Sequence, residues 1–327
     1  MVGGFRSTMP VYLSAFGSTQ VASTDLGQAA SRQAGALGIP MVIGENIVPV
    51  NGYGRLGTTD KSLLERISAY AETSPDGWGG VVVQQSTEDA DAEVWNLVYS
   101  DLSAQPLLDS GRLAFELKVG QGAKPGLGGM TVLDADKAAR IAEAFAIDPL
   151  FGSRVLRSSS PGTFTEEILH QQIRFMRNNF PRAKVWVKLP PARDIGSAVR
   201  VAWGAGADAV TVDGAEGGTG WAPSGCLRRI GEPEGCLLVT GRMWEGSRAA
   251  KAVALGARAV GLGRAALLAV DEDPEEGLVR LAECLALELR LLISSVGKYA
   301  PWALGSEDVW SRPAPEQILL PEQGVRS

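Results

Sequence analysis

Two glycine-arginine pairs follow short apolar runs in the last third of the chain. Gly241 and Arg242 come after Leu-Leu-Val-Thr, and Gly263 and Arg264 come after Ala-Val-Gly-Leu. Backbone amides beside a glycine, a cation and the N-terminus of a following helix together stabilise a phosphate dianion at little desolvation cost. The four residues therefore predict a phosphate site, although glycines also end strands where nothing binds.

Two lysines end other apolar runs, Lys118 in Phe-Glu-Leu-Lys-Val and Lys188 in Val-Trp-Val-Lys-Leu. A charge at the end of a buried strand needs an anionic or electron-rich partner. An isoalloxazine ring is one such partner, because a cation beside its pyrimidine edge stabilises the reduced anionic form. The alternative is an ion pair with Glu116, Glu45 or Asp213.

Glycine-rich segments follow two of these runs. Residues 212–220 contain four glycines in nine positions, which suits a backbone that approaches a ligand closely. Within them, Asp213 and Glu216 either bind ligand hydroxyls or cap the turn, and the role of Thr219 is open in the same way. Residues 121–126, Gln-Gly-Ala-Lys-Pro-Gly, form a second candidate anion loop.

Other chemistries have little support. His170 is the single histidine, in a stretch where Thr163 and Glu166 have capping-box spacing and Leu169, Ile173 and Met176 form an apolar stripe, so we expect a partly exposed helix residue. The three cysteines are widely spaced and suggest neither disulfides nor a metal site. A net charge of −6 argues against nucleic acid and anionic membranes as partners.

The elements that position these residues alternate between strand and helix. Eight short apolar runs predict buried parallel strands at 11–15, 40–43, 80–84, 113–119, 185–189, 209–212, 236–240 and 259–262. Helical patterns lie at 24–36, 135–145, 164–178, 197–205, 245–255 and 275–296. Eight such units predict a (βα)8 barrel with its site at the carboxyl ends of the strands. Residues 46–78 and 86–111 are expected to carry loops or extra helices over that mouth.

We predict one domain over residues 1–327, with a core at about 10–300 and a surface tail at 301–327. Barrels of this length are common as single domains. The chain has no apolar run of about 18 residues and no signal-peptide layout at its start, so we expect a cytoplasmic protein.

Several motifs together resemble the FMN-binding synthase domain of glutamate synthase. The most specific is Gln-Gly-Ala-Lys-Pro-Gly-Leu-Gly-Gly at 121–129, which is similar to the substrate loop of that family. Further similarity lies in Leu-Ser-Ala-Phe-Gly at 13–17, Ile-Gly-Glu-Asn at 43–46, Val-Lys-Leu at 187–189 and Asp-Gly-Ala-Glu-Gly-Gly-Thr-Gly at 213–220. In order, these motifs cover roughly residues 10 to 300.

The resemblance implies a barrel that binds FMN and performs hydride transfer at an imine carbon. It implies Lys124 and Glu45 as the catalytic residues that handle substrate charge and protons. It implies cofactor binding by Ser14, Ala15, Gln84, Lys118, Gln121, Lys188, Asp213, Gly214, Gly217, Gly218, Thr219, Gly241, Arg242, Gly263 and Arg264. Substrate contacts would come from Gln121, Lys124, Met130 and Arg140.

Departures from the family pattern concern the substrate and the electron route. Met130 stands where the family has a glutamine that contacts 2-oxoglutarate. The position of the family's carboxylate-binding arginine falls near Ala144, and Arg140, one helical turn away, is the candidate substitute. The segment between Leu267 and Leu281 contains no cysteine, so we expect no iron-sulfur cluster there. We also expect no amidotransferase domain before the barrel.

Three functional hypotheses follow. The first is an FMN-dependent oxidoreductase acting on an amino-acid-like or imine substrate, specialised away from ordinary glutamate synthesis. The second is a redox-neutral FMN isomerase or lyase, and the third is a non-catalytic barrel subunit whose ring pocket is filled by side chains. Expected partners are a small-molecule substrate, a nicotinamide or an electron-donor protein, and further copies of the chain.

Overall fold

Eight parallel strands close into a barrel in the computed structural model. The structure describes residues 1–15, 24–44, 62–86, 92–119, 129–133, 147–150, 153–158, 165–191, 194–214 and 222–310. In barrel order the strands are β1 (Val11–Leu13), β2 (Pro40–Ile43), β3 (Gly80–Ser86), β4 (Leu113–Lys118), β8 (Lys184–Leu189), β9 (Ala209–Asp213), β10 (Leu237–Thr240) and β11 (Ala259–Leu262). Because β1 pairs with both β2 and β11, the predicted (βα)8 barrel is confirmed.

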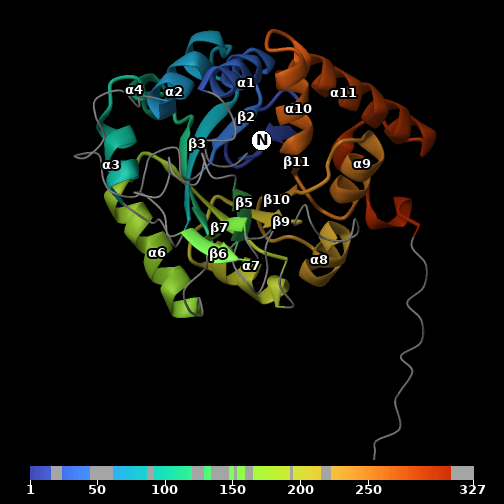
Figure 1. Ribbon diagram of the computed structural model, residues 1–327. Coiled ribbons are helices and arrows are strands. Elements are labelled where there is room, and N and C mark those ends of the chain that lie inside the picture. The colour runs from blue at the N-terminus through green and yellow to red at the C-terminus, as the bar shows by residue number, and fades with distance from the viewer. Residues whose placement is uncertain are drawn as a thin grey trace, which may run out of the picture.

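Helices surround the strands on the outside of the barrel (Figure 1). They are α1 (Thr24–Leu37), α2 (Ser62–Thr73), α3 (Ala92–Ser100), α4 (Gln105–Asp109), α6 (Glu166–Asn179), α7 (Ile195–Gly204), α8 (Ala222–Ile230), α9 (Gly246–Ala254), α10 (Arg264–Glu272) and α11 (Gly277–Ser295). The stretches at 46–78 and 86–111, expected to carry loops or extra helices, contain α2, α3 and α4.

The strands read as continuous apolar runs because both of their faces are buried. Outward side chains pack against the helices, and Phe115 of β4 stacks on Trp95 and meets Phe180 edge-on, with ring centroids 4.9 Å apart in the second pair. Inward side chains fill the barrel. Burial on both faces lets each strand contribute to the apolar core that stabilises the fold.

The amino-terminal end of the barrel is sealed by residues 2–5. Val2 and Phe5 are buried and pack with the inward residues Val82, Ala114 and Trp186. The Trp186 indole Nε1 donates a hydrogen bond of 2.9 Å to the Gly3 carbonyl. Since this end is apolar and filled, polar side chains that point inward must gather at the opposite, carboxyl end of the strands.

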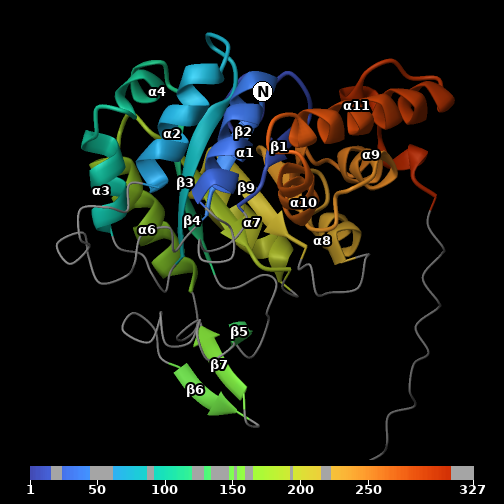
Figure 2. The ribbon, with the colours of Figure 1, turned by 45° about the horizontal axis from the view of Figure 1, so that its top comes forward.

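A small antiparallel sheet is inserted between β4 and α6. It consists of β5 (Gly129–Leu133), β7 (Ser153–Ser158) and β6 (Ile147–Leu150), with β7 in the middle. It stands apart from the barrel (Figure 2). The sequence patterns did not predict this sheet, and the helix predicted at 135–145 lies outside the described residues.

Helix α6 confirms the predicted stripe and corrects its start. Leu169, Ile173 and Met176 are buried, as expected. The N-cap is Thr165, whose side chain accepts from the Ile168 amide, so the cap lies two residues later than Thr163. His170 is exposed, 3.9 Å from Glu166, which agrees with the prediction of a partly exposed helix residue.

The described chain ends in two short 3-10 turns, Pro301–Ala303 and Ser306–Asp308, and residues 311–327 of the predicted tail lie outside the described part. Lys298 holds this region through ion pairs to Glu307 and Asp308. All three cysteines have free thiols. None of the described helices combines the length and the apolar character needed to cross a bilayer.

Candidate active site

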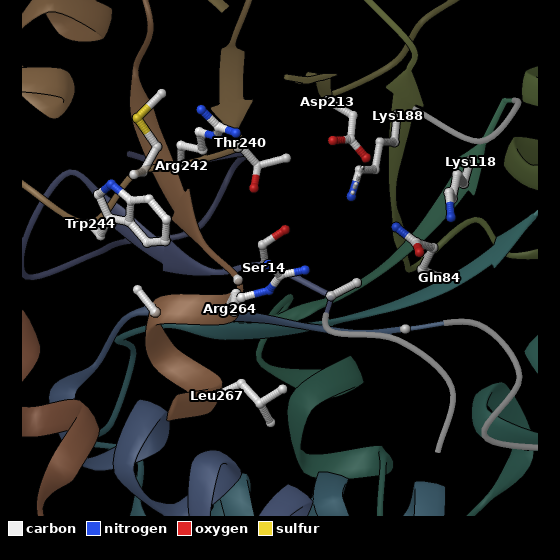
Figure 3. Close-up of a pocket in the computed structure, with 16 residues that line it drawn as sticks. Ser14, Gln84, Lys118, Lys188, Asp213, Thr240, Arg242, Trp244, Arg264 and Leu267 are labelled. Carbon is white, nitrogen blue, oxygen red and sulfur yellow. Dashed lines mark ion pairs between the residues drawn. The ribbon is translucent and has the colours of Figure 1, made fainter. Parts of the chain in front are cut away.

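A cavity of about 310 Å³ opens at the carboxyl ends of the barrel strands. Ten of the predicted cofactor residues line it: Ser14, Ala15, Gln84, Lys118, Lys188, Asp213, Gly241, Arg242, Gly263 and Arg264. Figure 3 shows Gln84, Lys118, Lys188 and Asp213 together at one end, with Arg242 and Trp244 at the other. The cavity is therefore an elongated site that joins the ends of strands β3, β4, β8 and β9 to the loops after β10 and β11.

The loops after β10 and β11 have the backbone features of an anion site. Gly241 has φ +112 and Arg242 has φ +53, so the chain turns through two left-handed residues directly after β10. Gly263 is the N-cap of α10 and gives it no side-chain cap. Gly263, Arg264 and Ala265 at the start of α10 line the cavity together with Arg242, so the uncapped amino end of this helix and two arginines border the same cavity.

Lys188 forms one of the ion pairs that the sequence suggested and also lines the cavity. Its Nζ lies 3.3 Å from the Asp213 carboxylate, and its side chain is nearly buried. The same lysine lines the cavity, as does Asp213. Lys118, its register partner on β4, is only partly buried and also lines the cavity. The ion pair therefore forms part of the site.

The charge of the described lining is strongly positive. Lys118, Lys188, Arg242 and Arg264 are opposed by one lining carboxylate, that of Asp213. Such an excess of cations around a concave surface favours an anionic ligand.

A buried carboxylate lies beneath this lining. Glu116 of β4 is 1% exposed and accepts hydrogen bonds from Gln84 Nε2 and, at 3.2 Å, from Thr211 Oγ1. Burial raises the pKa of Glu116, against the opposing effects of Lys188 and of its two hydrogen-bond donors. Burial and the nearby Glu116 also raise the pKa of Tyr12. The sequence indicates Glu116 only as an ion-pair partner for a lysine, so its hydrogen bonds beneath the cavity are a finding of the structure.

The raised pKa of Glu116 predicts a pH dependence of stability. A carboxyl whose pKa is higher in the folded state contributes stability below its unfolded value, about 4.3, and loses it as the pH rises through the folded value. Lys188, Asp213 and Tyr12 face this group and are unchanged in Glu116→Gln. We therefore expect the difference in free energy of unfolding, variant minus wild type, to increase upward from about pH 4 and then level off. Urea titrations of the two proteins across pH would measure it, and a difference that stays constant would contradict the prediction.

The structure describes only two of the remaining predicted site residues, Met130 and Gly214. Met130 lies on β5, and the Gly214 amide donates to the Thr240 carbonyl at 2.7 Å. Glu45, Gln121, Lys124, Arg140, Gly217, Gly218 and Thr219, together with Glu216, lie outside the described residues. Lining residues that the sequence did not predict are Gly44, Thr240, Met243, Trp244, Ala265 and Leu267. Among the described residues, no group of three or more His, Cys, Asp or Glu side chains could hold a metal ion.

Comparison with known families agrees with this geometry. A model of the conserved region in glutamate synthase matches residues 53–236, more than half of the chain. The chain belongs to the glutamate synthase family. A second model, of FMN-dependent dehydrogenases, matches residues 195–311, which include both glycine-arginine loops. The two matches place this family member among the FMN-dependent oxidoreductases and confirm the resemblance drawn from the motifs.

Individual relatives are distant. The archaeal-type glutamate synthase [NADPH] of Dehalococcoides mccartyi is 30% identical over 183 residues, covering 50% of this chain and 36% of that protein. A glutamate synthase large subunit-like protein of Rhizobium meliloti is 28% identical over 280 residues, covering 78% and 60%. This chain thus spans about a third to three fifths of these relatives. An (S)-mandelate dehydrogenase structure superposes with TM-score 0.62 at 19% identity, covering 95% of this chain and 83% of that one, and shares the fold.

Proposed function

We propose that this protein binds FMN in the cavity and uses it to transfer a hydride to or from an amino-acid-like or imine carbon. The observation that carries the proposal is the convergence of ten predicted cofactor residues on one cavity. FMN supplies the two-electron chemistry when it is bound. A cavity that remains open also counts against a non-catalytic subunit with a filled ring pocket.

The residues present fit this cofactor. A phosphate dianion suits the end of the cavity with Arg242, Arg264 and the uncapped start of α10. At the other end, Gln84 offers an amide and Lys188 a cation that would hold the polar edge of the ring. Asp213 orients the Lys188 ammonium through their 3.3 Å contact. The lysine charge would favour the flavin once it has gained negative charge.

We propose that the substrate differs from 2-oxoglutarate. Met130 cannot make the polar contact that the family's glutamine makes, and its thioether is a weak acceptor at best. Lys124 and Glu45 are proposed to handle substrate charge and protons, as the resemblance implies. NADPH, which appears in the name of the D. mccartyi relative, is the first electron donor to test.

The deciding experiment is the visible spectrum of the purified protein, with the heat-released cofactor identified by mass. Flavin absorbance and the mass of FMN are expected, followed by anaerobic bleaching with NADPH or with a panel of amino acids. A colourless protein that takes up no added FMN would overturn the proposal. Turnover without any net donor or acceptor would indicate a redox-neutral enzyme, and efficient glutamate formation from 2-oxoglutarate and ammonia would overturn the proposed specialisation.

Arg242 allows a separate prediction, because it combines a strained backbone with a cavity charge. A non-glycine residue at φ +53 costs about 1 kcal/mol. We expect Arg242→Gly to raise the free energy of unfolding of the flavin-free protein by about 0.5–1 kcal/mol and to weaken FMN binding about tenfold. Arg242→Lys keeps the charge and should retain most of the affinity. Urea denaturation and fluorescence titration with FMN would test both effects, and unchanged FMN affinity in Arg242→Gly would contradict the phosphate assignment.

A further inference from the structure

Glu116 lies one layer below the cavity and connects strands on two sides of the barrel. It is buried and is absent from the cavity lining, whereas its partner Gln84 lines the cavity. Gln84 belongs to β3, next to β4, and the other partner, Thr211, belongs to β9, two strands away on the opposite side of β4. The carboxylate therefore links Gln84 of β3 to Thr211 of β9, two strands that are not paired with each other.

These hydrogen bonds determine which end of the Gln84 amide the cavity receives. The amino group of Gln84 donates to a Glu116 oxygen, which is the arrangement that an ionised carboxylate requires because it can only accept. The amide oxygen is then the atom that Gln84 can present as an acceptor. Lys188, a donor, lines the same end of the cavity and is electrostatically coupled to the same carboxylate.

A purely structural role does not account for a carboxylate at this position. The inward layer below it, Val82, Ala114 and Leu238, is apolar and well buried. An apolar side chain of similar volume would avoid the desolvation that a buried carboxylate suffers. Its hydrogen bond from Gln84 and its charge coupling to Lys188 point to a role in arranging these two cavity residues.

We propose that Glu116 is a positioning residue that fixes the acceptor of Gln84 beside the donor of Lys188, so that the cavity floor selects a ring edge carrying an N–H next to a carbonyl. The inference rests on the proposed FMN function, since the pyrimidine edge of the flavin has this imide pattern. Glu116 itself touches neither cofactor nor substrate in this proposal. It acts through the orientation of Gln84.

The test compares two ligands, FMN and FMN methylated on N3, which lacks the N–H donor. In wild-type protein FMN should bind at least tenfold more tightly than the methylated form. In Glu116→Gln, the new amide can either accept a hydrogen bond from the Gln84 amino group or donate one to the Gln84 oxygen, so the orientation of Gln84 is no longer fixed. We therefore expect FMN affinity to fall about tenfold, while affinity for the methylated form hardly changes. The ratio of the two dissociation constants, measured by fluorescence titration, should therefore decrease about tenfold.

Thr211→Val is the matched control, because it removes the other hydrogen bond to Glu116 and leaves the Gln84 contact in place. Its affinity ratio should equal that of wild type. Should Glu116→Gln fail to fold, Glu116→Asp, whose shorter side chain withdraws the acceptor from Gln84, should lower the ratio in the same way.

The outcomes separate this inference from the function it rests on. A wild-type protein that binds neither flavin would overturn both. FMN binding with the same affinity ratio in wild type and Glu116→Gln would overturn the positioning role alone. A reduced ratio in Thr211→Val equal to that in Glu116→Gln would also overturn it, because the effect would then come from general loosening of the barrel interior.

Discussion

Lys188→Met is expected to slow reduction of the bound flavin about 100-fold, which corresponds to about 2.7 kcal/mol in the activation free energy. Lys188 is 5% exposed and lines the cavity, so its charge acts at short range with little solvent screening. Removal also leaves Asp213 without its cation at 3.3 Å. Loss of one partner from a nearly buried pair should lower the free energy of unfolding by about 3 kcal/mol.

The two effects can be separated with a second substitution. In Lys188→Met/Asp213→Asn the carboxylate that faced Lys188 is neutralised as well, so most of the stability should return while flavin reduction stays slow. Lys118→Met removes the same charge from the neighbouring strand, but from a partly exposed side chain, and should have a much smaller effect on the reduction rate. Stopped-flow reduction and urea denaturation measure the two quantities. A wild-type reduction rate in Lys188→Met would exclude Lys188 from the redox site.

The barrel could be predicted because its strands are buried on both faces and so appear as compact apolar runs. All eight predicted runs became barrel strands, with ends that moved by a few residues, as in β1, which stops at Leu13 instead of residue 15. The inserted sheet escaped prediction because β7, Ser-Arg-Val-Leu-Arg-Ser, mixes arginines with only two apolar residues. β7 pairs antiparallel with β5 and β6, and a pattern typical of buried parallel strands does not predict such a sheet.

The site was predictable where residues follow a strand directly. Position after a strand brought Ser14, Gly241 and Gly263 together, since the carboxyl ends of all barrel strands meet at one mouth. Glu116 was missed as a site component, although its alternation with Lys118 in Phe-Glu-Leu-Lys places both on the inward face. Trp244 and Leu267 were missed because they follow the two glycine-arginine loops by a few residues, where spacing alone does not tell which side chains turn inward.

The second large effect is expected at Gly241, where the backbone leaves β10. Its φ of +112 is open only to glycine, and a Cβ there would lie 2.9 Å from the Cα of Gly214. The obstacle is backbone that cannot move aside easily, because the Gly214 amide is hydrogen-bonded to the Thr240 carbonyl at 2.7 Å. Strain and steric overlap together should make Gly241→Ala less stable than wild type by about 3 kcal/mol.

Gly204→Ala provides the matched control, because it adds the same methyl group at the end of α7, where nothing lies within 4 Å and φ is ordinary. There alanine should leave stability unchanged or raise it by up to about 1 kcal/mol. Because Gly241 also sets the direction of Arg242, its alanine variant should bind FMN at least tenfold more weakly even at temperatures where it is fully folded. Thermal denaturation and FMN titration of both variants test this. If Gly241→Ala were as stable as Gly204→Ala, the close approach of the β9 and β10 ends would not constrain the loop that begins at Gly241. The proposed phosphate site would then not depend on the conformation of this loop.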